Sequence, residues 1–197
     1  MRAQEVISLR RALIFVAIAN LLYCAVELTV ALQIRSASLL ADSIDFLEDA
    51  SVNFLVLAAL NWSARVRARV GMVLAGLLLA PALATLWTVW RQLADPVAPA
   101  PFQLSLTGLG ALLVNLTCAL VLARFRKQSG SMIKAAFLSA RNDAFANIAI
   151  IGAGLVTLVW PSIWPDLVVG IAIAILNARA ATDVMQAARR EHADTRP

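Results

Sequence analysis

The sequence predicts an all-α, polytopic membrane protein with six transmembrane helices. Of its 197 residues, 61% are hydrophobic and only 15% are charged, whereas soluble domains are about half apolar and a quarter charged. Mean hydropathy is +0.79. This composition excludes a soluble enzyme, a disordered chain and a nucleic-acid-binding domain. Apolar runs of about 20 residues, the length that crosses a bilayer as a helix, occur six times, at 12–33, 38–61, 70–90, 103–123, 133–159 and 163–183.

Local signals justify these runs in chain order. The first begins directly after Arg10 and Arg11 and is too long for the core of a signal peptide, so we expect it to be retained. Three prolines in the segment 96–101 separate the third and fourth runs. Trp160 and Trp164, each followed by proline, flank the turn between the fifth and sixth runs. Tryptophan favours the membrane interface, so this turn is expected at the bilayer surface.

The distribution of lysine and arginine predicts the orientation. Fourteen of these 17 residues lie in the N-terminal segment, the second-to-third and fourth-to-fifth connectors, and the C-terminal tail. The opposite connectors hold only Arg35 and Arg91, and Arg141 lies inside the fifth run. Both termini are therefore expected in the cytoplasm, and the net charge of +5 reflects topology and contact with membrane lipids. The expected divisions are a cytoplasmic segment, a six-helix membrane domain and a short cytoplasmic tail, at 1–11, 12–183 and 184–197.

The second run contains four acidic residues within one stretch of eight: Asp42, Asp45, Glu48 and Asp49. At about 100° per helical residue, Asp42, Asp45 and Asp49 form one stripe, whereas Glu48 lies about 100° from Asp49 and is expected to face elsewhere. A charge at membrane depth costs at least ~2.5 kcal/mol on insertion scales. Such a stripe therefore indicates a functional site.

The fifth run carries a matching polar stripe. Ser139, Asp143 and Asn147 are spaced four residues apart and share one helix face. A shift of 94 positions aligns Asp49 and Asn53 with Asp143 and Asn147, and in both copies alanine follows the aspartate. We therefore expect the second and fifth helices to face each other and to build one site.

Carboxylates gathered in a low-dielectric bundle repel one another, so they need protons, a cation or water to remain together. One alternative is that Arg141 forms a salt bridge with Asp143. An all-oxygen set of ligands suits hard to borderline divalent ions such as Mg, Mn, Fe and Zn. The sequence thus predicts a site that holds a divalent cation when loaded and protons when empty, with the metal as substrate and no resident cofactor.

These motifs resemble those of the cation diffusion facilitator family. The resemblance to its first two helices runs from Asn20 through Glu27 to Ser36-x-Ser-Leu-Leu-Ala-Asp-x-x-Asp45-x-x-x-Asp49. The resemblance to its fifth helix is carried by Ser139-x-x-x-Asp143-x-x-x-Asn147.

The resemblance implies the transmembrane bundle of that family and a dimeric exporter that exchanges divalent metal for protons. Zinc is the first expected substrate, with Mn, Fe, Co and Cd as related ones. The partners implied are metal cations, protons, membrane lipids and a second copy of the chain, with no nucleic acid. The transport site carried over by position comprises Asp45, Asp49, Ser139 and Asp143.

Two departures from the family pattern stand out. Ser139 occupies a position that is commonly histidine or aspartate, and serine is a weak neutral ligand, so Asn142 or a water is expected as a fourth ligand. The family also usually carries a cytoplasmic C-terminal domain, so we expect a short form whose dimer is held by the membrane helices. Support for the site is expected from Asp42, which lies behind the ligands or at the mouth, from Asn53 and Asn147, and from Glu27, by interhelical hydrogen bonds or in a proton path.

The alternative function is a metal-binding or sensor membrane protein that does not transport. An enzyme is not expected, because the sequence contains neither the Gly-x-Gly-Asp motif of intramembrane aspartyl proteases nor the motif of CDP-alcohol phosphotransferases. The expected location is a bacterial inner membrane.

Overall fold

The computed structural model describes residues 3–59, 83, 85–125 and 130–176. In these ranges the chain forms six helical segments and no β-strand, which confirms the all-α class. The described helices are α1 (Ala3–Ile34), α2 (Ala37–Ala59), a helix at 85–94, α4 (Pro101–Ala123), α5 (Gly130–Val159) and a helix at Trp164–Leu176.

The predicted runs correspond to these helices with two partial exceptions. Most of the run 70–90, and the end of the run 163–183, lie outside the described residues. The predicted tail 184–197 also lies outside them, so the predicted domain limits stay predictions. α1 begins well before residue 12, so the basic N-terminal segment is part of the first helix from Ala3 onward.

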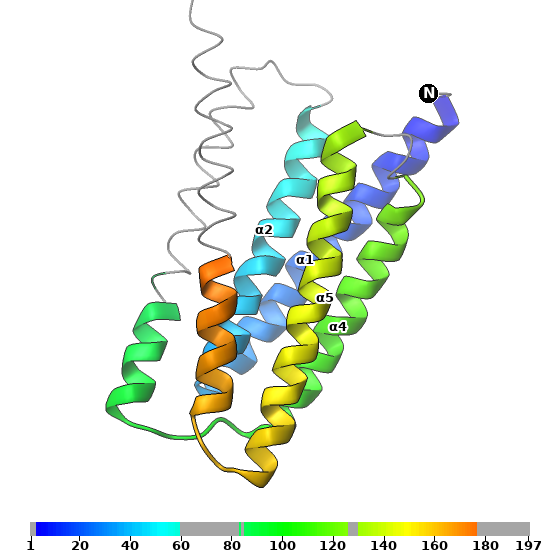
Figure 1. The fold of residues 1–197 in the computed structure, drawn as a ribbon. Helices are drawn as coiled ribbons and strands as arrows, with labels where there is room; N and C mark the ends of the chain where they lie inside the picture. The colour runs from blue at the N-terminus through cyan, green and yellow to red at the C-terminus, as the bar shows by residue number, and fades with distance from the viewer. Residues whose placement is uncertain (1–2, 60–82, 84, 126–129, 177–197) are drawn as a thin grey trace, which may run out of the picture.

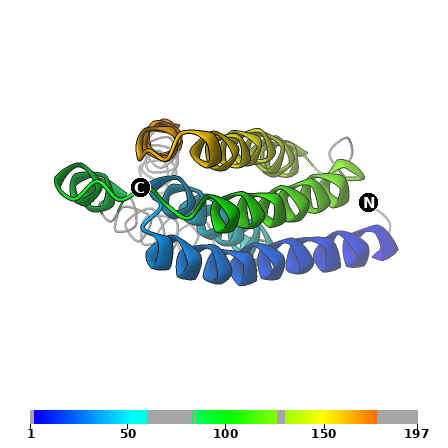
Figure 2. The ribbon, with the colours of Figure 1, turned by 90° about the horizontal axis from the view of Figure 1, so that it is seen from below.

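The four long helices form a ring in which α1 packs on α2, α2 on α5, α5 on α4 and α4 on α1. Figure 1 shows them running side by side, and Figure 2 shows the same bundle from below. Three connections lie at the bottom of the bundle in Figure 1: the turn at 35–36, the connector 95–100 and the turn 160–163. We call this end of the bundle the lower end. The helix Trp164–Leu176 lies beside α2 at this end, and the helix 85–94 lies on the far side of it in the view of Figure 1.

Local chemistry explains where these helices begin and end. Arg35 adopts a φ of 55°, in the left-handed region that commonly ends a helix. Ser36 N then donates to Ala31 O at 3.0 Å, and α2 begins at the next residue. α4 follows an extended Ala100 and begins with Pro101, a residue suited to the first helical position because it lacks an N–H group.

The surface of the bundle matches a lipid environment. Among the described helices, three segments are long and apolar enough to cross a membrane: Ile7–Ile34, Pro101–Ala123 and Ala136–Val159. Large apolar side chains such as Leu22, Leu120 and Phe145 point outward and are exposed. A helix in hydrocarbon satisfies its own backbone groups, so this chain is an integral membrane protein.

Small residues bring α4 and α5 together. A Cβ atom on Gly154 of α5 would lie only 3.1 Å from the carbonyl oxygen of Pro101 in α4. The absence of this atom lets the two backbones approach at the lower end of the bundle.

Candidate functional site

A cavity of about 230 Å³ lies between α2, α5 and the helix Trp164–Leu176. We call it the α2–α5 cavity. Polar residues from both predicted stripes line it, together with three apolar side chains. The lining residues are Asp45, Glu48, Asp49, Ser139, Asn142, Asp143, Ala146, Ile173 and Leu176. The two polar helix faces therefore converge, as their spacing in the sequence predicted.

Asp49 is the best-positioned carboxylate of the cavity. It is buried, and its Oδ1 accepts a hydrogen bond from Ser139 Oγ of α5 at 2.9 Å. One turn further along α2, Asn53 Nδ2 donates to the backbone oxygen of Asp49 at 2.8 Å. Asp49 is thus held from α5 through its side chain and from α2 through its backbone.

Asp45 and Asp143 face the same cavity from α2 and α5, and both are half-buried. Arg141 does not neutralise Asp143, because the structure forms no ion pair between these two described side chains. Instead, Arg141 is exposed and its Nη2 donates to Asn142 Oδ1 at 3.3 Å. The salt-bridge alternative for Asp143 is therefore wrong in this structure.

The lining of the α2–α5 cavity is acidic and rich in oxygen atoms that could bind a cation. It offers four carboxylates, one hydroxyl and one amide, and no lysine, arginine or histidine lines the cavity. Among the described residues, no three Asp, Glu, His or Cys side chains stand close enough together to hold a metal ion at once. Since a water takes about 30 Å³ of liquid volume, the cavity has room for a cation with part of its hydration shell.

Glu48 lies in the cavity wall, which corrects the expectation that it faces elsewhere. The angular argument placed Glu48 at the edge of the acidic stripe and treated the site as a contact between two helices only. The helix Trp164–Leu176 forms a third wall, so the cavity spans a wider arc of α2 and includes this side chain.

Asp42 and Glu27 do not line the cavity. Both are fully buried at the contact of α1 with α2, and their carboxyl groups face each other. In the described part of the chain no hydrogen-bond donor reaches any of their four oxygens. A place for Asp42 at the mouth of the site is therefore wrong. Glu27 of α1 lies close enough to Asp42 of α2 for a hydrogen bond between the two helices once one of the two carboxyl groups carries a proton. Asn147 is likewise fully buried with both side-chain polar atoms unpaired in these ranges.

Asp166 is a buried carboxylate that the sequence analysis missed. It lies near the start of the helix Trp164–Leu176, is fully buried, and contacts the start of α2. The available signal was an acidic residue just inside an apolar run, directly after Trp164-Pro165. Hydrophobic pattern and motif spacing gave it no partner, because its partners lie about 130 residues earlier in the chain.

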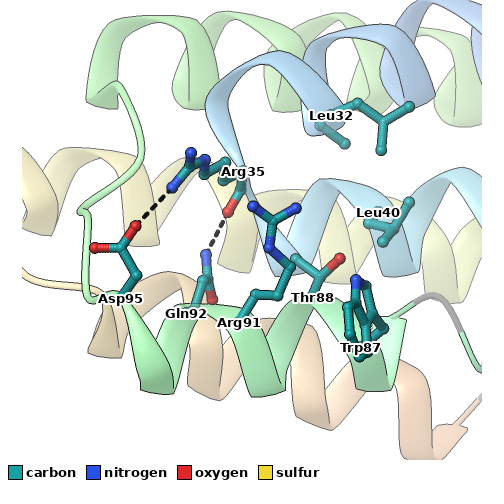
Figure 3. A pocket seen from close by; sticks show the side chains of 9 residues that line it. Leu32, Arg35, Leu40, Trp87, Thr88, Arg91, Gln92 and Asp95 are labelled. Atoms are coloured by element: carbon teal, nitrogen blue, oxygen red, sulfur yellow. Dashed lines mark hydrogen bonds and ion pairs between the residues drawn. The ribbon is translucent and has the colours of Figure 1, made fainter.

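A second cavity, also of about 230 Å³, lies at the lower end between α1, α2 and the helix 85–94 (Figure 3). Arg35 and Asp95 form an ion pair across one side of it at 3.0 Å, and both side chains are largely exposed to solvent. Trp87 and Leu32 contribute apolar surface. This cavity contains none of the predicted site residues.

Comparison with known proteins supplies the family. The model of the cation efflux transmembrane domain matches residues 13–190, which cover nearly the whole chain and include both polar stripes. A comparison with curated proteins gave no match. The match agrees with the helical architecture and with the resemblance carried by the second and fifth helices. The chain belongs to the cation efflux family, also called the cation diffusion facilitators, and is a membrane transporter of metal cations.

Proposed function

We propose that this protein exports a divalent cation, zinc or a similar ion such as Mn, Fe, Co or Cd, from the cytoplasm in exchange for protons. Asp45, Asp49 and Asp143 bind the cation, for which they must move closer together than they stand in this structure, and Ser139 or a water completes the ligand shell. The observation that carries the proposal is the α2–α5 cavity, in which carboxylates from both helices face one volume. Asn142 and Glu48 line the same cavity and supply further oxygens.

The same carboxylates explain the coupling to protons. Several acidic groups around one small volume repel one another when no cation is present. A divalent ion relieves this repulsion when it is bound, and protons relieve it when the ion has left. Because Arg141 points to Asn142 instead of to Asp143, it does not compete with the cation for Asp143. Exposure of the cavity to each membrane face in turn then gives exchange.

The setting of the transporter follows from its charge distribution and its family. We place both termini in the cytoplasm of a bacterial cell, because the lysine and arginine residues favour that side. The lower end of the bundle then faces outward. We also propose a homodimer that forms through the membrane helices.

The test is uptake into proteoliposomes that contain the purified full chain and a pH-sensitive dye. The metals offered are Zn, Mn, Fe, Co, Cd and Mg. Asp49→Ala should insert normally yet lose metal-dependent proton flux, because the variant lacks the most buried carboxylate of the cavity. Asp95→Ala is the matched control, since it also removes a carboxylate but at the exposed lower end.

Unchanged flux in Asp49→Ala would contradict the proposed site. Metal binding without flux in the unaltered protein would contradict transport and favour the metal-binding or sensor alternative.

A further inference from the structure

Asp166 accepts five hydrogen bonds, although it is an acidic residue in an apolar helix. Its Oδ1 accepts from Ser36 Oγ at 2.6 Å, from Ser38 Oγ at 2.5 Å and from Ser38 N at 3.2 Å. Its Oδ2 accepts from Ala37 N at 2.7 Å and from Gln92 Nε2 at 3.1 Å. The carboxyl group is thus fully used by donors from two other segments of the chain.

Four of these bonds come from Ser36, directly before α2, and from the first two residues of α2. The opening N–H groups of a helix have no partner within the helix, and a side chain close in sequence normally caps them. Ser36 caps one of these groups, because its Oγ accepts a hydrogen bond from Leu39 N at 3.1 Å. The N–H groups of Ala37 and Ser38 are instead capped by Asp166, which belongs to another helix. A carboxylate at a helix N-terminus is also favoured by the helix dipole.

A second contact locks the same two helices together. A Cβ atom on Gly170, one turn after Asp166, would lie only 2.6 Å from the carbonyl carbon of Ala37. The backbone of the helix Trp164–Leu176 therefore lies directly against the start of α2. Ile173 and Leu176 follow on this helix and form part of the wall of the α2–α5 cavity.

Gln92 brings the helix 85–94 into the same cluster. Its Nε2 donates to Asp166. It also donates to the carbonyl oxygen of Arg35, in the turn between α1 and α2, as Figure 3 shows. Gln92 is itself buried. Asp166 therefore joins the start of α2, its own helix and the helix 85–94 at one point of the lower end.

We propose that Asp166 is a positioning residue of the cation site. By fixing the start of α2 against the helix Trp164–Leu176, it sets where Asp45 and Asp49 stand relative to the third wall of the cavity. Asp45 lies seven residues after Ser38, about 10 Å along the helix axis at 1.5 Å per residue. This inference rests on the proposed transport site.

Asp166 affects the cation site through the position of α2. Binding groups must stay within about 0.5 Å of their working positions, and residues that do not touch the ligand hold them there. Hydrogen bonds to a charged acceptor are the stronger kind, so Asp166 is suited to this role. If it is lost, α2 can rotate or slide against the third wall, and the carboxylates of the cavity lose their fixed spacing.

The first experiment is Asp166→Asn in the full chain, with zinc uptake measured over a range of concentrations. The substitution keeps the size of the side chain but turns one accepting oxygen into a donor that faces other donors. We expect KM for zinc to rise at least tenfold. Asp95→Asn, which removes a carboxylate from the same end but outside the cluster, should leave KM unchanged.

Ser38→Ala supplies a milder test of the same contact and completes a double-mutant cycle. It should raise KM in the same direction as Asp166→Asn, and the double variant should be no worse than Asp166→Asn alone. Fully additive effects, or an unchanged KM in both single variants, would overturn the proposal. If Asp166→Asn does not fold, an unchanged KM in Ser38→Ala is sufficient to overturn it.

The second experiment measures the position of α2 without any transport. Spin labels are placed at residues 54 and 168 through Phe54→Cys and Val168→Cys, because both side chains are exposed, with Cys24 and Cys118 replaced by alanine. Asp166→Asn should shift or broaden the distance distribution between the labels, and Asp95→Asn should not. An unchanged distribution overturns the positioning role and leaves the transport site standing. Unchanged flux in Asp49→Ala contradicts the site whatever the spin labels show.

Discussion

Two groups of buried carboxylates in this protein have opposite surroundings. Asp166 at the lower end is saturated by five donors from α2 and the helix 85–94. Asp42 and Glu27, between α1 and α2, have no donor in the described part of the chain. The carboxylates of the α2–α5 cavity stand between these extremes, with one donor, Ser139, on Asp49.

This difference separates a structural acid from acids that are free to exchange partners. A carboxylate whose lone pairs are all occupied by fixed donors has no capacity left for a mobile ion. One with few or no donors needs a cation, a proton or water. The comparison therefore marks Asp166 as a fixed point of the bundle and supports the proposal that the exchangeable carboxylates lie deeper along α2.

Among the substitutions that test this comparison, a substitution of Asp166 should lower the free energy of unfolding the most. Asp166→Ala leaves two backbone N–H groups, two serine hydroxyls and the Gln92 amide without their acceptor. A buried donor left without its acceptor costs about 1–3 kcal/mol, and five donors lose theirs here, so we expect a loss of about 3 kcal/mol or more. The measurement is thermal unfolding of the purified protein in detergent. A change below ~1 kcal/mol would show that water replaces Asp166 and that the cluster is not a fixed point.

A smaller effect of the opposite sign is expected at Asp42. Asp42→Asn replaces one of two facing carboxyl groups by an amide that can donate to Glu27. A net hydrogen bond contributes about 1 kcal/mol, so the unfolding temperature in detergent should rise. Asp42→Ala is the matched control, because it removes the charge and supplies no donor. A lower unfolding temperature in Asp42→Asn would mean that the pair already holds a bound cation or a shared proton that the amide disrupts.

The smallest effect is expected at the exposed ion pair of the lower end. Asp95→Asn breaks the contact with Arg35, whose side chain is 50% exposed while that of Asp95 is 72% exposed. Exposed pairs contribute about 0.2–1 kcal/mol and are screened by salt. Unfolding in detergent should therefore change by less than ~1 kcal/mol, and less still in high salt. A loss as large as that of Asp166→Ala would mean that this pair belongs to the fixed point.

Much of the fold and the site followed from local patterns. The second and fifth helices were expected to face each other because their polar residues recur every three to four positions, and Asp45, Asp49, Ser139 and Asp143 do line one cavity. Glu48 was misplaced because the angular argument assumed a contact between α2 and α5 only, without the third wall formed by the helix Trp164–Leu176. Asp42 was placed behind the ligands or at the mouth, and its pairing with Glu27 depends on how α1 packs on α2.

The sequence by itself determined the helical membrane class, the conspicuous acids and the pairing of two polar stripes. Hydrophobic runs and helical periodicity are local properties, and the bilayer permits few other structures for such runs. Tertiary structure alone decided that the helix Trp164–Leu176 forms a third wall of the cavity and that Asp166 caps α2. Hydrogen bonds between residues some 130 positions apart depend on how whole helices pack. No periodic pattern in the sequence reveals that packing.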